Sequence, residues 1–426
     1  MISLLAHPDS VQGAEKLTLR DCIEIALKNQ PSIKIAQQNI QAAEGRETQA
    51  VSPYFPQVNA STGYSESHQL GIALGFPGAA VGTVITKSYA TSLSLNQVLY
   101  DFGKTGNSLD VARWNIRSSE RDRDRTVQDV VLNVKQSYYG LLAAKKLVEV
   151  AQKTIEQTDG HLKQAEAFFR SGSKPRFDVT RAEVEVNNAK LGMINATNGV
   201  RIRTITLNNA MGIDPGQATE IVDTLPALSA VTTLEQAQAD SLKNRPEMLK
   251  ADADIEAAKS KVSAEESNYL PTISANGAYN WQSGTQEFGP FKSDLQNSWN
   301  AGVMLTVPLF QGGLTQGRVS EARANLIAVE VQRDATKQSI LLEVNQFYAD
   351  MESAKVRVDV MESTLQKARE NLDLASGRYE AGVGPYLEIT DAQLSAINAE
   401  TDRIQALYDY YLAVARLLKA TGKGME

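Results

Sequence analysis

The sequence has few of the residues from which catalytic and metal sites are usually built. Of its 426 residues, one is cysteine and three are histidine. Cys22 cannot form an intrachain disulfide, and we expect it to be a small buried hydrophobic residue. His7, His68 and His161 are too scattered to indicate a metal cluster, and there is no nucleophile motif or glycine-rich phosphate loop. The sequence therefore predicts no enzyme, no metal site and no cofactor.

Basic surface and long apolar runs are also scarce. The chain has 43 Lys and Arg against 50 Asp and Glu, a net charge of −7, which argues against a nucleic-acid partner. No segment provides the roughly 20 consecutive apolar residues of a transmembrane helix. The uncharged stretch 69–86 comes nearest, but glycines and a proline interrupt it, and it is expected to be a loop. Residues 1–15 resemble the end of a secretory signal and are predicted to be a disordered remnant of one.

The chain consists of one unit of about 200 residues written twice, and such a repeat is the most informative feature of a sequence. Residues 17–33 align with 232–248 at a shift of 215 residues. Further along, a shift of 210 pairs Tyr138 with Tyr348, Gly172 with Gly382, Pro175 with Pro385 and Gly212 with Gly422. We predict a first repeat at 16–215, a linker at 216–231 and a second repeat at 232–422.

Each repeat is predicted to contain a helix, two strands, a very long helix, a turn and a returning helix. The strands are expected at about 54–66, 88–101, 269–283 and 297–311, and the helical hairpins at about 105–210 and 314–421, with tips at 170–178 and 380–388. The long proline-free helices of some 65 residues would each be about 100 Å long, too long for a compact domain. Their apolar residues recur at intervals of three and four, as coiled-coil packing requires.

The predicted strands alternate apolar and polar residues and are nearly free of charge. Between residues 67 and 100 the only charged residue is Lys87, and 298–316 has none. This pattern is typical of outer-membrane strands, whereas a soluble hairpin with one solvated face normally carries Lys or Glu. Four strands cannot close a barrel or hide their edges in lipid, so the chain is expected to share a barrel with further copies.

Several motifs carry a family resemblance that covers essentially the whole chain. They are ALKNQP (26–31) with SLKNRP (241–246), YFPQV (54–58) with YLPTI (269–273), and the two hairpin tips. With the internal repeat, they resemble the outer membrane efflux protein (TolC) family. The resemblance implies a mainly α fold with a membrane β-barrel: a homotrimer with one shared twelve-stranded barrel in the outer membrane of a Gram-negative bacterium, continuing into a long α-helical barrel that extends into the periplasm.

The resemblance also implies a function and partners. Such proteins are passive exit ducts of tripartite efflux or type I secretion systems, surrounded by outer-membrane lipid. They are docked by a periplasmic adaptor (membrane fusion) protein and an inner-membrane RND, ABC or MFS transporter. The alternative is a soluble periplasmic coiled-coil structural or adaptor protein, since the long helices alone fit it; the four charge-poor strands argue against this alternative.

The hairpin tips are the candidate functional site. By resemblance, Glu388 and Asp391 face the pore and form acidic constriction rings, Asp178 is the corresponding acid of the first tip, and Tyr379 matches a latch tyrosine. The resemblance assigns adaptor docking to Ser171, Gly172, Ser173, Ala381, Gly382 and Val383. Read from the residues alone, the acids could instead offset the helix dipole, and Tyr379 could be an ordinary interhelical aromatic.

Three positions depart from the family pattern. Ser171 and Ala381 stand where valine is usual, so the docking specificity is expected to differ. Gly384 stands where a well-known member has an arginine that links neighbouring hairpins. We therefore hypothesise that the closed state of this protein lacks one salt-bridge latch, and that replacing Gly384 by arginine would supply it.

Overall fold

The computed structural model of the chain describes residues 16–72, 81–225, 233–288, 291–294 and 296–424. The elements repeat in the same order in both halves of the sequence, as the internal repeat predicts. They fall into two compact units, which are described separately. The helical unit comprises the described residues of 1–38, 120–249 and 334–426, and the strand unit those of 39–119 and 250–333.

Each half begins with two short helices separated by a proline. They are α1 (Leu19–Asn29) and α2 (Pro31–Val51) in the first half, and α5 (Leu234–Asn244) and α6 (Pro246–Glu266) in the second. Thr18 caps α1 in a capping box, because its hydroxyl accepts from the Asp21 backbone and the Asp21 carboxylate accepts from the Thr18 backbone. Thr233 caps α5 through its side chain in the same position.

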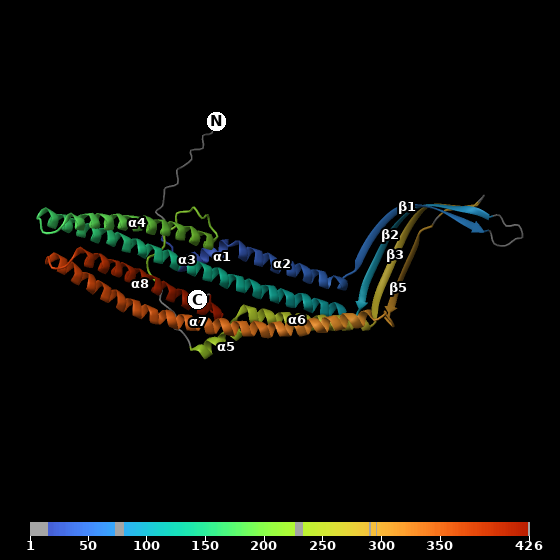
Figure 1. Ribbon diagram of the computed structural model, residues 1–426. Helices are drawn as coiled ribbons and strands as arrows, with labels where there is room; N and C mark the ends of the chain where they lie inside the picture. Colours follow the sequence, from blue (N-terminus) through green and yellow to red (C-terminus); the bar gives the residue numbers. More distant parts are fainter. Residues whose placement is uncertain (1–15, 73–80, 226–232, 289–290, 295, 425–426) are drawn as a thin grey trace, which may run out of the picture. The chain divides into compact units, whose positions relative to one another are not determined.

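Two helical hairpins make up most of the chain. The outgoing helices, α3 (Lys104–Arg170) and α7 (Leu314–Glu380), have 67 residues each, and the returning helices are α4 (Arg176–Met211) and α8 (Tyr386–Ala420). Figure 1 shows α3 with α4, and α7 with α8, as antiparallel pairs. At 1.5 Å per residue, each outgoing helix is about 100 Å long, which confirms the predicted long helices. None of the described helices combines the length and the apolar character needed to cross a bilayer.

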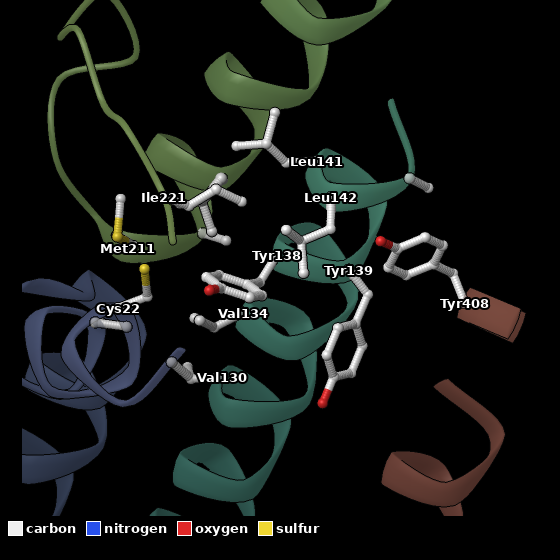
Figure 2. Close-up of a cluster of buried hydrophobic side chains, with 14 of the residues drawn as sticks. Cys22, Val130, Val134, Tyr138, Tyr139, Leu141, Leu142, Met211, Ile221 and Tyr408 are labelled. Carbon is white, nitrogen blue, oxygen red and sulfur yellow. The ribbon is translucent and has the colours of Figure 1, made fainter. Parts of the chain in front are cut away.

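The main core of the helical unit lies where α1 packs against α3 and α4. Figure 2 shows Tyr138 and Val134 of α3 beside Cys22 of α1 and Met211 of α4. The Tyr138 hydroxyl donates to the backbone carbonyl of Val222, 3.1 Å away. Cys22 is fully buried, and burial raises the pKa of its thiol to about 12, so it acts as a small hydrophobic residue, as expected.

The second repeat builds a related core from α5, α6, α7 and α8. Val344 and Ala237, the repeat counterparts of Val134 and Cys22, are both fully buried there. The segment between the repeats packs on the first core, because Ile221 is buried and bridges Leu17 in parallel. Of the predicted linker, 226–231 lies outside the described residues.

The strand unit holds an antiparallel sheet. Its strands are β1 (Gln57–Ile72), β2 (Val81–Tyr100), β3 (Thr272–Phe288), β4 (Phe291–Asp294) and β5 (Ser298–Thr306). The long strands follow the order β1-β2-β3-β5, and β3 also pairs with the short β4. The sheet therefore contains the four expected strands, with β1 and β5 at its two edges.

The strands begin and end differently from the sequence expectation. Short 3-10 helices at Ser52–Tyr54 and Ser267–Tyr269 precede β1 and β3, and β5 ends at Thr306 rather than at 311. The prediction of a loop at 69–86 is wrong at both ends, because residues 69–72 and 81–86 are paired strand residues. Residues 73–80 lie outside the described residues. These glycine-containing ends are stabilised as strand by pairing with each other, and the sequence of one segment alone does not show which segment it pairs with.

The two faces of the sheet differ in chemistry. Register places Ala60, Leu93, Tyr279 and Trp299 side by side on one face across all four long strands. The opposite face carries hydroxyl pairs, with Ser61 and Ser92 oxygens 2.7 Å apart and those of Ser65 and Ser88 2.9 Å apart. The apolar face is exposed in the single chain, Trp299 to 74%.

Candidate functional site at the hairpin tips

The first tip connects α3 to α4 through a turn that needs glycine. Gly172 has a φ of 72°, and its amide donates to the carbonyl of Phe169. The next amide, of Ser173, donates to Phe168, so the last carbonyls of α3 are satisfied by a left-handed glycine cap. Pro175 then precedes α4 in an extended conformation, which starts the returning helix without needing its own amide.

The second tip repeats this geometry. Gly382 has a φ of 77°, and the amides of Val383 and Gly384 both donate to the carbonyl of Arg378. Pro385 precedes α8 in the same extended conformation as Pro175. The six residues predicted to dock an adaptor, at 171–173 and 381–383, therefore occupy equivalent turns, and all six are exposed.

Asp178 and Tyr379 are brought together across the two hairpins. The Tyr379 hydroxyl donates to Asp178 Oδ2, 3.2 Å away, and both side chains are buried. The ring of Tyr379 also packs edge-on against Phe168 of α3 and Tyr386 of α8, with centroids 5.4 and 5.5 Å apart. Burial, and then the Asp178 charge, raise the pKa of Tyr379, so this phenol stays a hydrogen-bond donor.

The two acids of the second tip have different environments. Glu388 lies against Arg378 of α7, with Arg378 Nε 3.0 Å from Glu388 Oε2. Asp391, one turn further along α8, is exposed, and its carboxylate has no hydrogen-bond or ion-pair partner within the described part of the chain. The spacing of three that suggested one shared role therefore places one acid in an ion pair and leaves the other open to solvent.

Three side chains at the tips were not identified from the sequence. Arg378 holds Glu388, Lys174 contacts the second tip, and Phe177, 67% exposed, adds an apolar surface to the first tip. The repeat alignment contained a signal for the first two. The shift of 210 pairs Phe168 with Arg378 and Lys174 with Gly384, positions at which the two repeats differ in charge.

The structure also explains the absence of a side chain at Gly384. A Cβ there would lie 3.1 Å from Arg378 Cβ and 3.2 Å from Glu388 Oε2. Contacts of this kind force the neighbouring side chains to move. Replacing Gly384 by arginine would therefore require Arg378 and Glu388 to shift, and it stays a prediction that such an arginine would supply the missing latch.

Comparisons with known proteins agree with this architecture. The model of a family described as outer membrane efflux protein matches residues 22–213 and 237–423. The chain is 24% identical over 419 residues to protein CyaE of Bordetella pertussis, covering 98% of this chain and 86% of that protein. It is 22% identical over 404 residues to outer membrane protein TolC of Vibrio cholerae, covering 93% and 89% of the two chains.

A solved structure shares the fold over nearly the whole chain. A crystal structure of CusC, described in terms of folding and transmembrane channel formation, matches with a TM-score of 0.81 at 20% identity. The match covers 99% of this chain and 96% of that one. The predicted fold class, long helical hairpins with four long strands in a doubled chain, is thereby confirmed.

Proposed function

Because the chain belongs to the outer membrane efflux protein family, we propose that three copies of it form an exit duct across the outer membrane and periplasm of a Gram-negative bacterium. The family consists of channel proteins rather than enzymes, and we propose no catalytic activity for this chain. The duct conducts passively, and the inner-membrane transporter supplies the energy. Efflux of small molecules and type I secretion of proteins both remain open, because the names of further relatives refer to antibiotic efflux and to protease secretion.

The open sheet is the observation that carries this proposal. In the described chain β1 pairs only with β2, and β5 only with β3, so each edge strand has one unpaired side. In lipid, every unpaired backbone group costs several kcal/mol. Pairing β5 of one copy with β1 of the next removes both edges. Three copies of four long strands make twelve strands, enough to leave a passage.

The helical unit supports the same arrangement. The first of its returning helices, α4, exposes an apolar stripe that contains Val184 and Leu191, seven residues apart. On α7, Leu342 and Val356 form a second exposed stripe, fourteen residues apart. Stripes at heptad spacing are coiled-coil seams that lack a partner. Packing α4 of one copy on α7 of the next is a head-to-tail contact, which closes into a ring.

The surfaces at the two ends of the duct indicate which lipid and protein partners it has in this proposal. The apolar face of the sheet meets outer-membrane lipid, and its hydroxyl-rich face lines the passage. The tips receive a periplasmic adaptor and, through it, an RND, ABC or MFS transporter. Val383, 72% exposed, and Phe177 offer apolar contacts for that adaptor. Asp178, Tyr379, Glu388 and Asp391 form the periplasmic gate in this proposal.

The repeats are also proposed as the units of assembly. Each repeat, 16–215 and 232–422, contributes two long strands and one hairpin, so the trimer contains six similar units. The family model matches the chain in two stretches whose ends lie close to these boundaries, which supports the proposed division. A ring with this internal repetition places equivalent tips at regular intervals around the gate.

The assembly is tested by charging the α7 stripe. We expect the variant Leu342→Glu with Val356→Glu to lose the trimer, because carboxylates would be buried at the seam. Lys355→Glu, which adds negative charge at an exposed neighbouring position of α7, is the control and should remain trimeric. Light scattering of detergent-extracted protein measures the mass. Recovery of the wild-type chain in the soluble periplasm without detergent would favour the coiled-coil alternative instead.

The docking surface is tested by crosslinking in cells. A photoreactive residue at Ser173 or at Val383 is expected to capture a periplasmic adaptor, identified by mass spectrometry. Gln366, exposed on α7 away from the turns, is the control position. Capture of the adaptor at Gln366 but at neither tip would refute the docking assignment.

A further inference from the structure

Lys174 reaches from the first tip onto the second. Its Nζ lies 3.0 Å from the carbonyl oxygen of Gly384 and 3.4 Å from that of Gly382. The same ammonium lies over the ring of Tyr379, 5.1 Å from the centroid. One side chain therefore contacts the turn of the second hairpin at two carbonyls and one aromatic face.

The site on the second tip is suited to a cation. The two carbonyls follow the C-terminal end of α7, where the helix dipole is negative and a lysine ammonium is favoured. The face of an aromatic ring also attracts a cation. Gly384 is buried and has no side chain, and the Lys174 ammonium contacts its carbonyl oxygen there.

The contact depends on a difference between the repeats. Lys174 and Gly384 are counterparts at the shift of 210 residues, so one repeat supplies the donor and the other supplies an acceptor carbonyl at the same position of the turn. If both repeats had lysine here, two ammonium groups would meet; if both had glycine, the donor would be absent. The difference makes the two tips complementary.

We propose that Lys174 is a positioning residue of the gate, which clamps the first hairpin tip to the second and holds the duct in its constricted arrangement. This inference rests on the proposed duct function. The clamp acts beside the buried hydrogen bond from Tyr379 to Asp178, so the hairpins are joined by two links. Separating the tips requires both links to break. Lys174 supplies the link between hairpins whose absence the glycine at 384 suggested.

The clamp is tested first by hydrogen exchange in the purified trimer. Lys174→Met keeps the aliphatic stem and removes the donors, and we expect the amides of Val383 and Gly384 to exchange about tenfold faster, as for the loss of one charge-assisted hydrogen bond. Lys163→Met removes an exposed lysine from α3 and is the control. Lys174→Arg keeps the charge and donors and should restore slow exchange. Equal exchange in the Lys174→Met and Lys163→Met variants would overturn the clamp.

The gating role is tested by single-channel recording in planar bilayers. Lys174→Met should raise the open-to-closed ratio about tenfold. Adding Tyr379→Phe should raise it further, because each link adds its own free energy to the closed arrangement. Lys174→Arg should stay close to wild type. Faster exchange with an unchanged open-to-closed ratio would overturn the gating role. If the wild-type protein conducts no current at all, the proposed function fails, while the exchange experiment still decides the clamp.

Discussion

Gly212 and Gly422 should be the least replaceable glycines of the helical unit. They are counterparts in the two repeats, they end α4 and α8, and their φ values are 70° and 78°. Each turn lies against the end of a short helix. A Cβ at Gly212 would lie 3.0 Å from the backbone of Asn29, and one at Gly422 would lie 2.8 Å from that of Asn244. Alanine at either position therefore meets both an unfavourable backbone conformation and a clash with backbone atoms.

The expected cost combines these two effects. A non-glycine residue in the left-handed region costs about 1 kcal/mol, and overpacking costs about 1–3 kcal/mol. We expect Gly422→Ala to destabilise the helical unit by about 2–4 kcal/mol, and Gly212→Ala by about 2 kcal/mol because its contacts are less close. Gly199→Ala is the control within α4: no neighbouring atom lies within 4 Å of the added Cβ, so it should stabilise by about 0.5–1 kcal/mol.

The measurement should resolve local opening, because the two glycines lie against different short helices. Native-state hydrogen exchange of peptides from α1 and α5 reports the opening free energy on each side of the repeat. Gly212→Ala should speed exchange in α1, and Gly422→Ala should speed it in α5. Two results would contradict this expectation: both variants are as stable as Gly199→Ala, or each variant speeds exchange in the other short helix.

Four further variants test charges in the helical unit. Burial lowers the pKa of His161 below its ordinary value of 6.5, although the charge of Glu380 opposes this shift. The unfolded chain therefore binds a proton at this imidazole more readily than the folded chain, and the free energy of unfolding falls as the pH drops below 6.5. His161→Gln should reduce that fall in melting curves taken between about pH 7.5 and 5. Arg245→Met should destabilise the helical unit by about 3 kcal/mol in denaturant titrations, because the buried guanidinium pairs with two carboxylates. Asp391→Asn should relieve block by divalent cations in bilayers more than Glu388→Gln, since Arg378 already neutralises Glu388; equal relief would contradict this.

The long helices and the duplication could be predicted because their signals are local or periodic. Prolines at 31 and 246 separate the short helices, and glycines at 172 and 382 end the outgoing ones. Such residues act through their own backbone conformation, which the sequence shows directly. The strands could be predicted because their alternation of apolar and polar residues is periodic. The repeat then doubled each signal, which made the order of elements clear.

The strand ends and the contacts between the hairpin tips could not be predicted, because their causes lie far away in the sequence. Residues 69–72 are strand only because 81–84 pair with them. Lys174 is separated from Gly384 by 210 residues, and Asp178 from Tyr379 by 201. A family pattern identified Asp178 and Tyr379 as candidates, but it contained no information on Lys174, whose partner is a backbone carbonyl.

In the proposed gate, the contacts at the tips determine which links would break if the hairpins separated. Glu388 is held by Arg378 within its own hairpin, so this ion pair survives the separation. Asp178 occupies the equivalent position of the first hairpin and accepts a hydrogen bond from Tyr379 of the second, so separation of the hairpins breaks this bond. Lys174 adds a second contact that is lost in the same movement. An opening that moves each hairpin as a rigid pair therefore breaks only links between repeats, and substitutions at Arg378 should affect the second tip without loosening the clamp.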